Sequence, residues 1–226
     1  AQQTRDPRLA RRASEMALAA KQGGEALAAI RLWRELAPES DEATQFFLGF
    51  VVLTDKIEEA EPIFAQRIEA APPGSRGVAL FQTHQILARA NDKLYAYSML
   101  VRLMEPYQDM FETHLVLSQG ALTIGERERA IAEANKALQM KPASELAVLT
   151  LAQVSGEPQA ANKVLADFLA KNPDAVEVRA AYARLLVEQK QLEAARDQFL
   201  LLLKSQPDNV GGLYALGIVA LQLEDT

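Results

Sequence analysis

The sequence predicts an all-α fold in which pairs of antiparallel helices stack side by side into a solenoid. Residues 111–142 contain two amphipathic segments that meet at Gly125 and end at Pro142, as expected for a helix-turn-helix unit. Prolines recur along the chain at intervals of about 34 residues, which indicates copies of that unit. Apolar residues make up 49% of the chain, enough for a continuous core.

The unit at residues 111–142 carries small residues on the faces that its two helices turn toward each other. At helical spacing these are Leu117, Ser118 and Ala121 in the first helix and Ala130, Ala134, Ala137 and Leu138 in the second. Side chains this small allow two helices to approach closely, with Gly125 at the bend. Such a hairpin cannot bury its apolar face alone, so it needs neighbouring copies.

Each predicted repeat ends shortly after its second helix at a residue that we call its closing position, which is a proline in every repeat but the third. The closing positions are Pro38, Pro72, Gln108, Pro142, Pro173 and Pro207. The steps from Pro38 to Pro72, from Gln108 to Pro142 and from Pro173 to Pro207 are equal in length. The step from Pro142 to Pro173 is shorter by three residues, so we expect the first helix of that repeat to be shortened near residues 155–158.

On these residues the chain resembles the tetratricopeptide repeat (TPR) family, whose unit is a helix pair of about 34 residues with a proline near its end. The matching residues are Phe47, Val51, Ile57, Ala60, Phe64 and Pro72 in the second repeat, Leu117, Ser118, Ala121, Gly125, Ala130, Ala134, Ala137 and Pro142 in the fourth, and Tyr182, Ala183, Leu186, Ala195, Phe199, Leu202 and Pro207 in the sixth. The resemblance implies a right-handed solenoid of about six and a half repeats, whose first helices line a concave groove.

The chain is expected to form a single solenoid of consecutive repeats. They occupy residues 7–40, 41–74, 75–110, 111–144, 145–175, 176–209 and, as half a repeat, 210–226. The turn Pro72-Pro73-Gly74 is the strongest break, and we expect a hinge at 72–74. The half repeat leaves the apolar residues Leu213 and Leu216 without a partner helix. We therefore expect the parent protein to continue, with self-association through this end as the alternative.

Individual residues in the sequence predict where single helices bend, begin or are shortened. The pair Gly23-Gly24 is predicted to form the bend of the first repeat, and Trp33 falls on the inner face of its second helix, where we expect a core residue. Pro62 lies within the first two turns of its helix and predicts a bent or shortened helix. Asp174 with Glu177 predicts a capping box at the start of the sixth repeat.

Composition argues against several classes of function. The net charge of −6 disfavours nucleic acid, which requires a basic face. The clustered basic residues at the amino end are interpreted as the solvated face of a first helix, with an anionic docking site as the alternative; they are Arg5, Arg8, Arg11 and Arg12. No apolar run approaches the roughly 20 residues that span a bilayer. Cysteine is absent, so the chain has no disulfide or thiolate metal site.

The sequence contains no pattern typical of a catalytic site. It lacks a glycine-rich phosphate loop and a serine in a nucleophile-elbow setting. The two histidines, His84 and His114, lie in successive predicted first helices, and without a third ligand we interpret them as packing residues rather than a metal site. We therefore expect a protein that is not an enzyme and that binds no cofactor and no metal.

The expected groove supplies the candidate binding residues. The TPR resemblance places groove residues at fixed positions: the ninth gives Gln85, Gln119 and Gln153, and the fifth gives Gln45, Phe81, Leu115, Leu149 and Tyr214, with Phe46 beside Gln45. Carboxamides both donate and accept hydrogen bonds, so a row of glutamines beside an apolar strip is suited to an extended or helical peptide of a protein partner. The alternative is that glutamine is only a good helix former on a wet face.

One variety of groove is excluded on the resemblance. Chaperone-docking members of the family hold a C-terminal carboxylate with a lysine and asparagine clamp. In this chain Arg11, Gln45, Phe81 and Leu115 stand at the positions of that clamp, so it is not present.

Both ends of the chain also resemble a narrower group. Residues 6–40, which begin DPRLARRASEMALAAK, and residues 178–225, which begin VRAAYARLLVEQKQLEAARDQF, are similar to exported TPR proteins of proteobacteria. One member of that group is an outer-membrane lipoprotein that assembles with a periplasmic carboxyl-terminal processing protease. This resemblance implies a periplasmic or outer-membrane-associated adaptor of such a protease, with a cytoplasmic location as the alternative. The cysteine that would carry a lipid is missing from the chain.

Two classes of function therefore follow from the sequence. The favoured one is a non-catalytic scaffold that binds a protein or extended peptide in its groove. The alternatives are a TPR module of a longer enzyme and a structural protein that assembles with itself.

Overall fold

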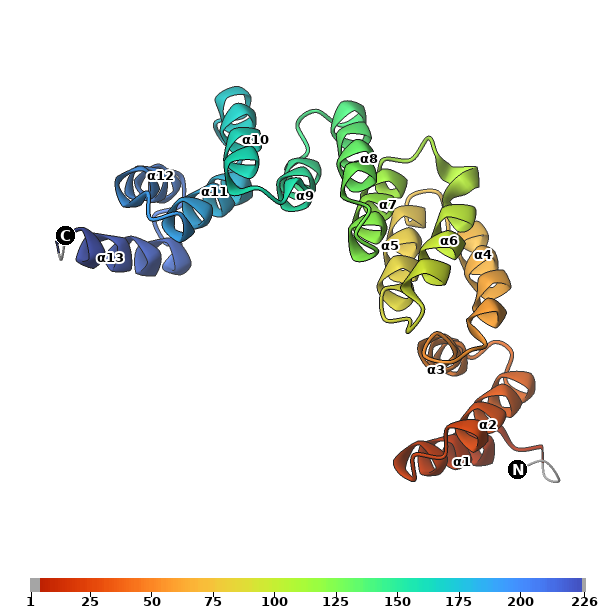
Figure 1. Ribbon diagram of the computed structural model, residues 1–226. Helices are drawn as coiled ribbons and strands as arrows, with labels where there is room; N and C mark the ends of the chain where they lie inside the picture. Colours follow the sequence, from red (N-terminus) through yellow and green to blue (C-terminus); the bar gives the residue numbers. More distant parts are fainter. Residues whose placement is uncertain (1–4, 225–226) are drawn as a thin grey trace. The chain divides into compact units, whose positions relative to one another are not determined.

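The computed structural model describes residues 5–224, which form thirteen α-helices and two short 3-10 helices and no strand in that range (Figure 1). The predicted all-α fold is confirmed. The chain divides into two compact units, Ala1–Pro106 and Tyr107–Thr226. Within each unit a helix contacts mainly the next one or two helices along the chain, which is the local contact pattern of a solenoid.

The described part of the first unit contains six α-helices. They are α1 (Pro7–Ala19), α2 (Gly23–Leu36), α3 (Asp41–Val51), α4 (Glu61–Ala70), α5 (Arg76–Leu87) and α6 (Lys93–Met104), with the 3-10 helices η1 (Ile57–Ala60) before α4 and η2 (Glu105–Tyr107) after α6. Helices α4 and α6 are linked by Arg102, which donates two hydrogen bonds of 2.7 Å to the carboxylate of Glu61. Trp33, predicted to be core, is 4% exposed.

The described part of the second unit contains seven α-helices. They are α7 (Phe111–Thr123), α8 (Arg127–Met140), α9 (Glu145–Ser155), α10 (Pro158–Lys171), α11 (Val176–Glu188), α12 (Leu192–Ser205) and α13 (Val210–Glu224). Apolar side chains of successive pairs interlock here: Leu165 and Phe168 of α10 join Val148 of α9 and Val178 of α11 in one buried cluster. None of the helices described for this chain is long and apolar enough to cross a membrane.

The helix bounds can be set beside the predicted repeats. Each of the six full ranges contains two successive α-helices, and the last range contains α13. The proposed hinge at 72–74 is the turn between α4 and α5, whereas the two compact units meet at Pro106 and Tyr107. The hinge and the repeat boundaries stay predictions.

Three helix pairs share one turn, in which a residue with positive φ follows the first helix. That residue is Gly125 (φ 82°), Lys21 (φ 56°) or Lys190 (φ 58°). The conformation brings backbone N–H groups back to the open carbonyls of the helix, as when Glu126 N donates to Ala121 O at 3.0 Å. The bend predicted at Gly125 is confirmed. The bend predicted at Gly23-Gly24 is wrong, because the turn ends at Gln22 and both glycines belong to α2.

The pair α7–α8 has the close packing that its small residues predict. Ser118, Ala130, Ala134 and Ala137 have no exposed surface. The hydroxyl of Ser118 donates to the backbone oxygen of Ala130 at 2.8 Å, so a side chain of α7 bonds directly to the backbone of α8. This contact requires the short side chains that the sequence provides.

Two predicted shortenings are present. Pro62 stands in the first turn of α4, which has 10 residues and is preceded by the 3-10 helix η1. Helix α9 has 11 residues, against 13 in both α7 and α11, and ends at Gly156, whose φ is 77°. Two of the three missing residues of the fifth repeat are thus taken from its first helix, and the third from the connection that follows it.

The capping box predicted from Asp174 and Glu177 is wrong. The residue before α11 is Ala175, whose side chain cannot accept a hydrogen bond. Instead, the carboxylate of Glu145 in α9 accepts from the backbone N–H groups of Glu177 at 2.9 Å and Val178 at 3.1 Å. A carboxylate at a helix start stabilises it through the free N–H groups and the helix dipole. The cap therefore comes from the preceding repeat.

Candidate functional site

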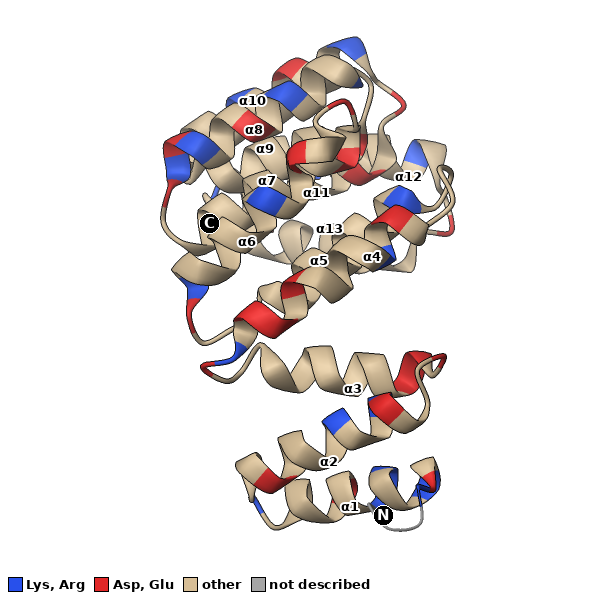
Figure 2. Ribbon diagram, turned by 90° about the vertical axis from the view of Figure 1, so that its right-hand side faces the viewer, with Lys and Arg blue, Asp and Glu red and all other residues tan. Residues whose placement is uncertain are grey.

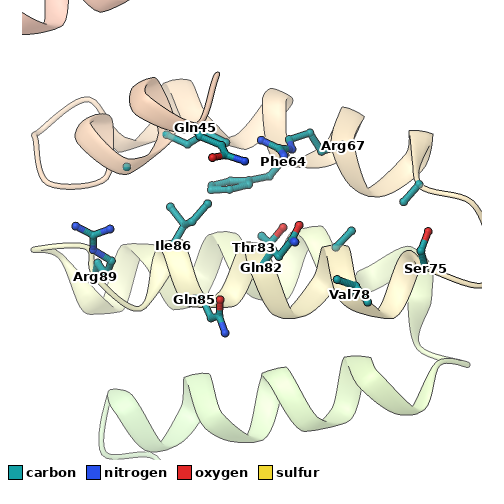
Figure 3. Close-up of a pocket in the computed structure, with 14 residues that line it drawn as sticks. Gln45, Phe64, Arg67, Ser75, Val78, Gln82, Thr83, Gln85, Ile86 and Arg89 are labelled. Carbon is teal, nitrogen blue, oxygen red and sulfur yellow. The ribbon is translucent and has the colours of Figure 1, made fainter. Parts of the chain in front are cut away.

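A groove of about 550 Å³ opens in the first unit, with α3 and α4 on one side and α5 on the other (Figure 3). Its lining residues are Gln45, Leu48 and Gly49 of α3, Phe64 and Arg67 of α4, Ala71 and Ser75 of the following turn, Val78, Ala79, Gln82, Thr83, Gln85 and Ile86 of α5, and Arg89. Pockets of a few hundred Å³ are the size that holds a ligand or a peptide segment.

The groove exists because α3 packs toward α2 and not against its own partner helix. The ring of Phe47 lies under the guanidinium of Arg34 at 4.4 Å, and the ring of Phe46 lies 5.5 Å from that of Trp33. Residues 52–60 then form a long connection before α4 begins. A long connection does not force two helices together as a tight turn does, so α3 stands apart and leaves space above α4.

The other wall is fixed by Arg76, the first residue of α5. Its guanidinium donates to the backbone oxygens of Ile68 at 3.3 Å, Glu69 at 3.4 Å and Ala71 at 3.2 Å. These are carbonyls at the C-terminus of α4, which have no partner within the helix. Arg76 therefore satisfies the end of α4 and holds the start of α5 beside it.

The lining combines an apolar base with carboxamides and cations. Figure 3 shows Phe64 and Arg67 reaching down from one wall and Thr83 and Ile86 reaching up from the other. Three glutamines, two arginines, Ser75 and Thr83 supply the polar side-chain atoms, and none of the 14 described lining residues is acidic. The acidic residues of α3 lie in its first turn, and the rest of that helix is uncharged (Figure 2).

This chemistry is suited to binding a polypeptide. Glutamine side chains can donate to and accept from a peptide backbone, while Val78, Ala79 and Ile86 of α5 offer apolar contact. The lining residues of α5 and its flanks run from Ser75 to Arg89, which at 1.5 Å of rise per residue is about 21 Å, the length of about six residues of extended chain. No nucleophile paired with a base stands among the described lining residues.

His84 of α5 lies near the groove in sequence but is not one of its lining residues. It is 8% exposed, and neither ring nitrogen has a hydrogen-bond partner among residues 5–224. Burial lowers the pKa of His84, because removal from water disfavours the imidazolium. The ring is therefore neutral and acts as a packing residue.

The predicted binding residues of the first unit fall in three environments. Gln45 and Gln85 line the groove. Phe46 is 37% exposed and packs against Trp33. Phe81 is half-buried on α5 and is not a lining residue.

The predicted residues of the second unit are also divided. Leu149 and Gln153 of α9 line a smaller hollow of about 280 Å³ with Arg184 and Glu188 of α11. Gln119 is half-buried on α7. On α13, Tyr214 is 73% exposed, and self-association through this helix stays a prediction.

The exposed position predicted for Leu115 is wrong. Leu115 is fully buried, and all six consecutive residues 113–118 are buried. Six successive buried residues cover all sides of a helix, so this part of α7 has no solvent-facing strip. Leu115 is a core residue and cannot line an open groove.

The residues that give the groove its charge, above all Arg67, were not among the predicted binding residues. The sequence does contain a pattern that singles out Arg67. Five residues before each closing position the other repeats carry an apolar residue, and the second repeat carries Arg67; the apolar ones are Trp33, Leu103, Ala137, Phe168 and Leu202. Gln82 and Thr83 were missed because their positions in the repeat are not among those expected to face a groove. Arg89 stands four residues after Gln85, at a position that the TPR resemblance also places in the groove, but it was not selected as a candidate.

The second unit contains a buried polar cluster in the fourth repeat. His114 Nδ1 lies 2.7 Å from the Glu133 carboxylate, and Nε2 lies 2.9 Å from the backbone oxygen of Gln108. Lys136 donates to the other Glu133 oxygen at 2.9 Å. Burial raises the pKa of Glu133, but the hydrogen bonds from His114 and Lys136 lower it by more, so the net pKa is lowered. Both ring nitrogens of His114 are thus engaged in hydrogen bonds.

The arrangement of His114 is structural rather than metal-binding. Both ring nitrogens are already occupied by hydrogen bonds to Glu133 and Gln108. In the part of the chain that the structure describes, no group of three or more His, Cys, Asp or Glu side chains is placed to hold a metal ion.

Comparison with protein families gives one match. Residues 155–216 match the model of the tetratricopeptide repeat. The matched 62 of 226 residues span α10, α11, α12 and part of α13, so the TPR resemblance is supported there. Among curated proteins, no sequence is similar enough to match the chain.

Solved structures of TPR proteins are similar at low sequence identity. A thermophilic TPR protein of Thermus thermophilus is 16% identical, with 96% of this chain and 100% of that chain covered and a TM-score of 0.47. YrrB, a TPR protein described as having an unusual peptide-binding site, is 12% identical, with coverages of 89% and 87% and a TM-score of 0.43. The APC/C hetero-tetramer Cut9-Hcn1 contains a chain that is 13% identical, with a TM-score of 0.46; the match covers 96% of this chain and 43% of that longer one.

Proposed function

We propose that the chain is a non-catalytic scaffold that binds an extended segment of a protein partner in the groove between α3 and α5. The observation that carries the proposal is the groove itself, which is long enough for about six extended residues and is lined by carboxamides over an apolar base. The fold supports it, because helix-pair solenoids offer long surfaces and few reactive groups.

Gly49 provides a direct test. It lines the groove, and a Cβ added at this position meets no atom within 4 Å. Gly49→Phe therefore fills the groove without displacing the core. Gly24→Phe is the matched control, since Gly24 is an exposed glycine of α2, also has no atom within 4 Å of an added Cβ, and lies outside the groove.

The measurement is selection of short random peptides by the whole chain, followed by fluorescence anisotropy with the selected peptides. We expect Gly49→Phe to weaken peptide binding by roughly tenfold or more, which corresponds to at least about 1.4 kcal/mol. Gly24→Phe should bind as the unaltered chain does. Equal binding by all three proteins would contradict the groove as the binding site.

We further propose that the partner is a processing protease of the bacterial envelope and that the protein is periplasmic or outer-membrane-associated. The similarity of both chain ends to exported proteobacterial TPR proteins supports this assignment. Fractionation of the native cells with an antibody against the chain tests the location. Recovery in the cytosol would contradict it and would leave the groove proposal intact.

A further inference from the structure

Arg67 occupies a position that is apolar in every other full repeat. Five residues before the closing position, the other second helices carry Trp33, Leu103, Ala137, Phe168 and Leu202, and all five are buried. Helix α4 ends two residues before Pro72, just as α2 ends two residues before Pro38, so Arg67 has the same register as Trp33. A guanidinium has therefore replaced a core side chain in one repeat only.

The buried end of Arg67 lacks a partner. Nη1 is inaccessible to solvent, yet it has no hydrogen-bond partner among the described residues. The nearest carboxylate oxygen is that of Asp41, 3.8 Å from Nη2, which is beyond hydrogen-bond distance, and Asp41 is itself 89% exposed. An arginine normally satisfies such a site with a bidentate carboxylate or phosphate. An unpaired buried donor is costly to the free protein. The Arg67 side chain as a whole is 31% exposed, so its outer atoms are within reach of a ligand in the groove.

The charge of the groove agrees with an anionic occupant. Among the described residues that line it are Arg67 and Arg89 and no acidic residue. The chain as a whole, by contrast, has a net charge of −6. Figure 3 shows Arg67 opposite Gln82 and Thr83, between Ser75 at one end of the groove and Arg89 at the other. One cation therefore lies near the middle of the groove and the second lies at one end.

We propose that the segment held in this groove is acidic, with one carboxylate bound by Arg67 and a second near Arg89. This inference rests on the proposed peptide-binding function and names the chemistry of its ligand. From Gln82 to Arg89 the helical rise is about 10 Å, which is the length of about three residues of extended chain. The ligand should therefore carry two acidic side chains about three residues apart, with the glutamines of the groove on its backbone.

The test repeats the random-peptide selection with the whole chain and with Arg67→Leu and Arg12→Gln. Leucine is the residue found at this register in the third and sixth repeats, and Arg12 is an exposed arginine of α1 outside the groove. We expect the unaltered chain and Arg12→Gln to enrich peptides rich in Asp and Glu. Arg67→Leu should still select peptides but without acidic enrichment, and should bind the acidic ones roughly tenfold to a hundredfold more weakly.

Synthetic copies of a selected peptide distinguish the source of the carboxylate. Each is prepared with a free and with an amidated C-terminus, and with its acidic residues changed to Asn or Gln. Loss of binding on the change to Asn or Gln supports side-chain recognition as proposed. Loss on amidation alone overturns it in favour of a terminal carboxylate.

The failures of the two proposals are separable. If the chain selects peptides that Gly49→Phe does not bind, but those peptides are not acidic, the acidic-ligand inference is wrong and the groove function stands. If no peptide is selected by any variant, both are wrong.

A second readout is the melting temperature: Arg67→Leu should leave it unchanged or raise it, because an apolar residue fits this register in the other repeats. A lower melting temperature would assign Arg67 to structure rather than recognition.

Discussion

The second and fourth repeats have the same length between closing positions, yet one contains an open groove and the other a closed hairpin. In the fourth, residues 124–126 join α7 to α8 and Ser118 bonds to the backbone of the facing helix. In the second, residues 52–60 join α3 to α4 and both helices are shorter. When the repeat length is the same, a longer connection leaves shorter helices. The two helices of the repeat can then lie further apart, which leaves room for a binding surface.

The two repeats also place polar groups differently. The buried carboxylate of Glu133 in the fourth repeat is fully paired, by His114 and Lys136. The buried Nη1 of Arg67 in the second has no partner in the described structure. A paired buried group contributes to a rigid hairpin. The Arg67 side chain, by contrast, is 31% exposed at an open groove, where its outer atoms can meet a ligand.

The largest effect is expected from His114→Ala. It removes the main partner of a buried carboxylate, since the side chain of Glu133 is 11% exposed, and should lower the free energy of unfolding of the second unit by about 3–5 kcal/mol. Chemical denaturation followed by circular dichroism measures this. Lys136→Ala is the control: the Lys136 side chain is 52% exposed, and its removal should cost about 1 kcal/mol or less. Equal losses in both variants would contradict a buried pair.

The same pair predicts a pH dependence. The pKa of Glu133 is lowered from its ordinary value of 4.5 in the folded chain. A group with a depressed folded pKa stabilises the fold above its unfolded pKa, and that contribution is lost as pH falls through the folded pKa. The unaltered chain should therefore lose stability below the ordinary pKa of glutamate, and His114→Ala should lose less over the same range.

A smaller effect tests the close packing of the fourth repeat. Ala134→Leu inserts three carbons where α7 and α8 meet, at a residue with no exposed surface, and should lower the free energy of unfolding by about 1–3 kcal/mol. The matched change in the open repeat is Ala65→Leu, at an exposed site of α4, and should alter it by about 0.5 kcal/mol or less. Equal costs would mean that the two repeats are equally tight.

The smallest effect concerns the turns. Gly125 and Lys190 follow α7 and α11 in the same positive-φ conformation, which a side chain disfavours. Lys190→Gly should raise the free energy of unfolding by about 1 kcal/mol or less, because it removes the clash of Cβ while the flexible glycine costs entropy in the unfolded chain. Gly125→Lys should lower it by a similar amount. A thermal melt of each variant decides between these signs.

The sequence predicted the helix pairs because their signals are local and periodic. Prolines at a recurring interval, together with Ala130, Ala134 and Ala137 at helical spacing, locate the helices and the buried face of α8. The same repeat length also predicted that Pro62 lies near the start of a shortened helix, as it does in α4. Such features depend on neighbours within a few residues, so the chain itself specifies them.

Features that depend on distant residues could not be read in the same way. The cap of α11 comes from Glu145 in another helix, and the burial of Leu115 depends on what surrounds α7. The groove could not be located from sequence, because it depends on how repeat two divides its residues between helix and connection.

The burial of Leu115 also changes the choice of mutation. Leu115→Asp would bury a charge and unfold the chain, so a loss of binding in that variant would say nothing about a groove.

Hydrogen exchange of the whole chain with and without a selected peptide tests the central claim most directly. The account predicts that the peptide slows exchange of backbone amides in α3, α4 and α5, with Gly49→Phe abolishing the effect. Slowed exchange confined to α9 and α11, which line the smaller hollow, or no change in any helix, would contradict a binding groove in the first unit.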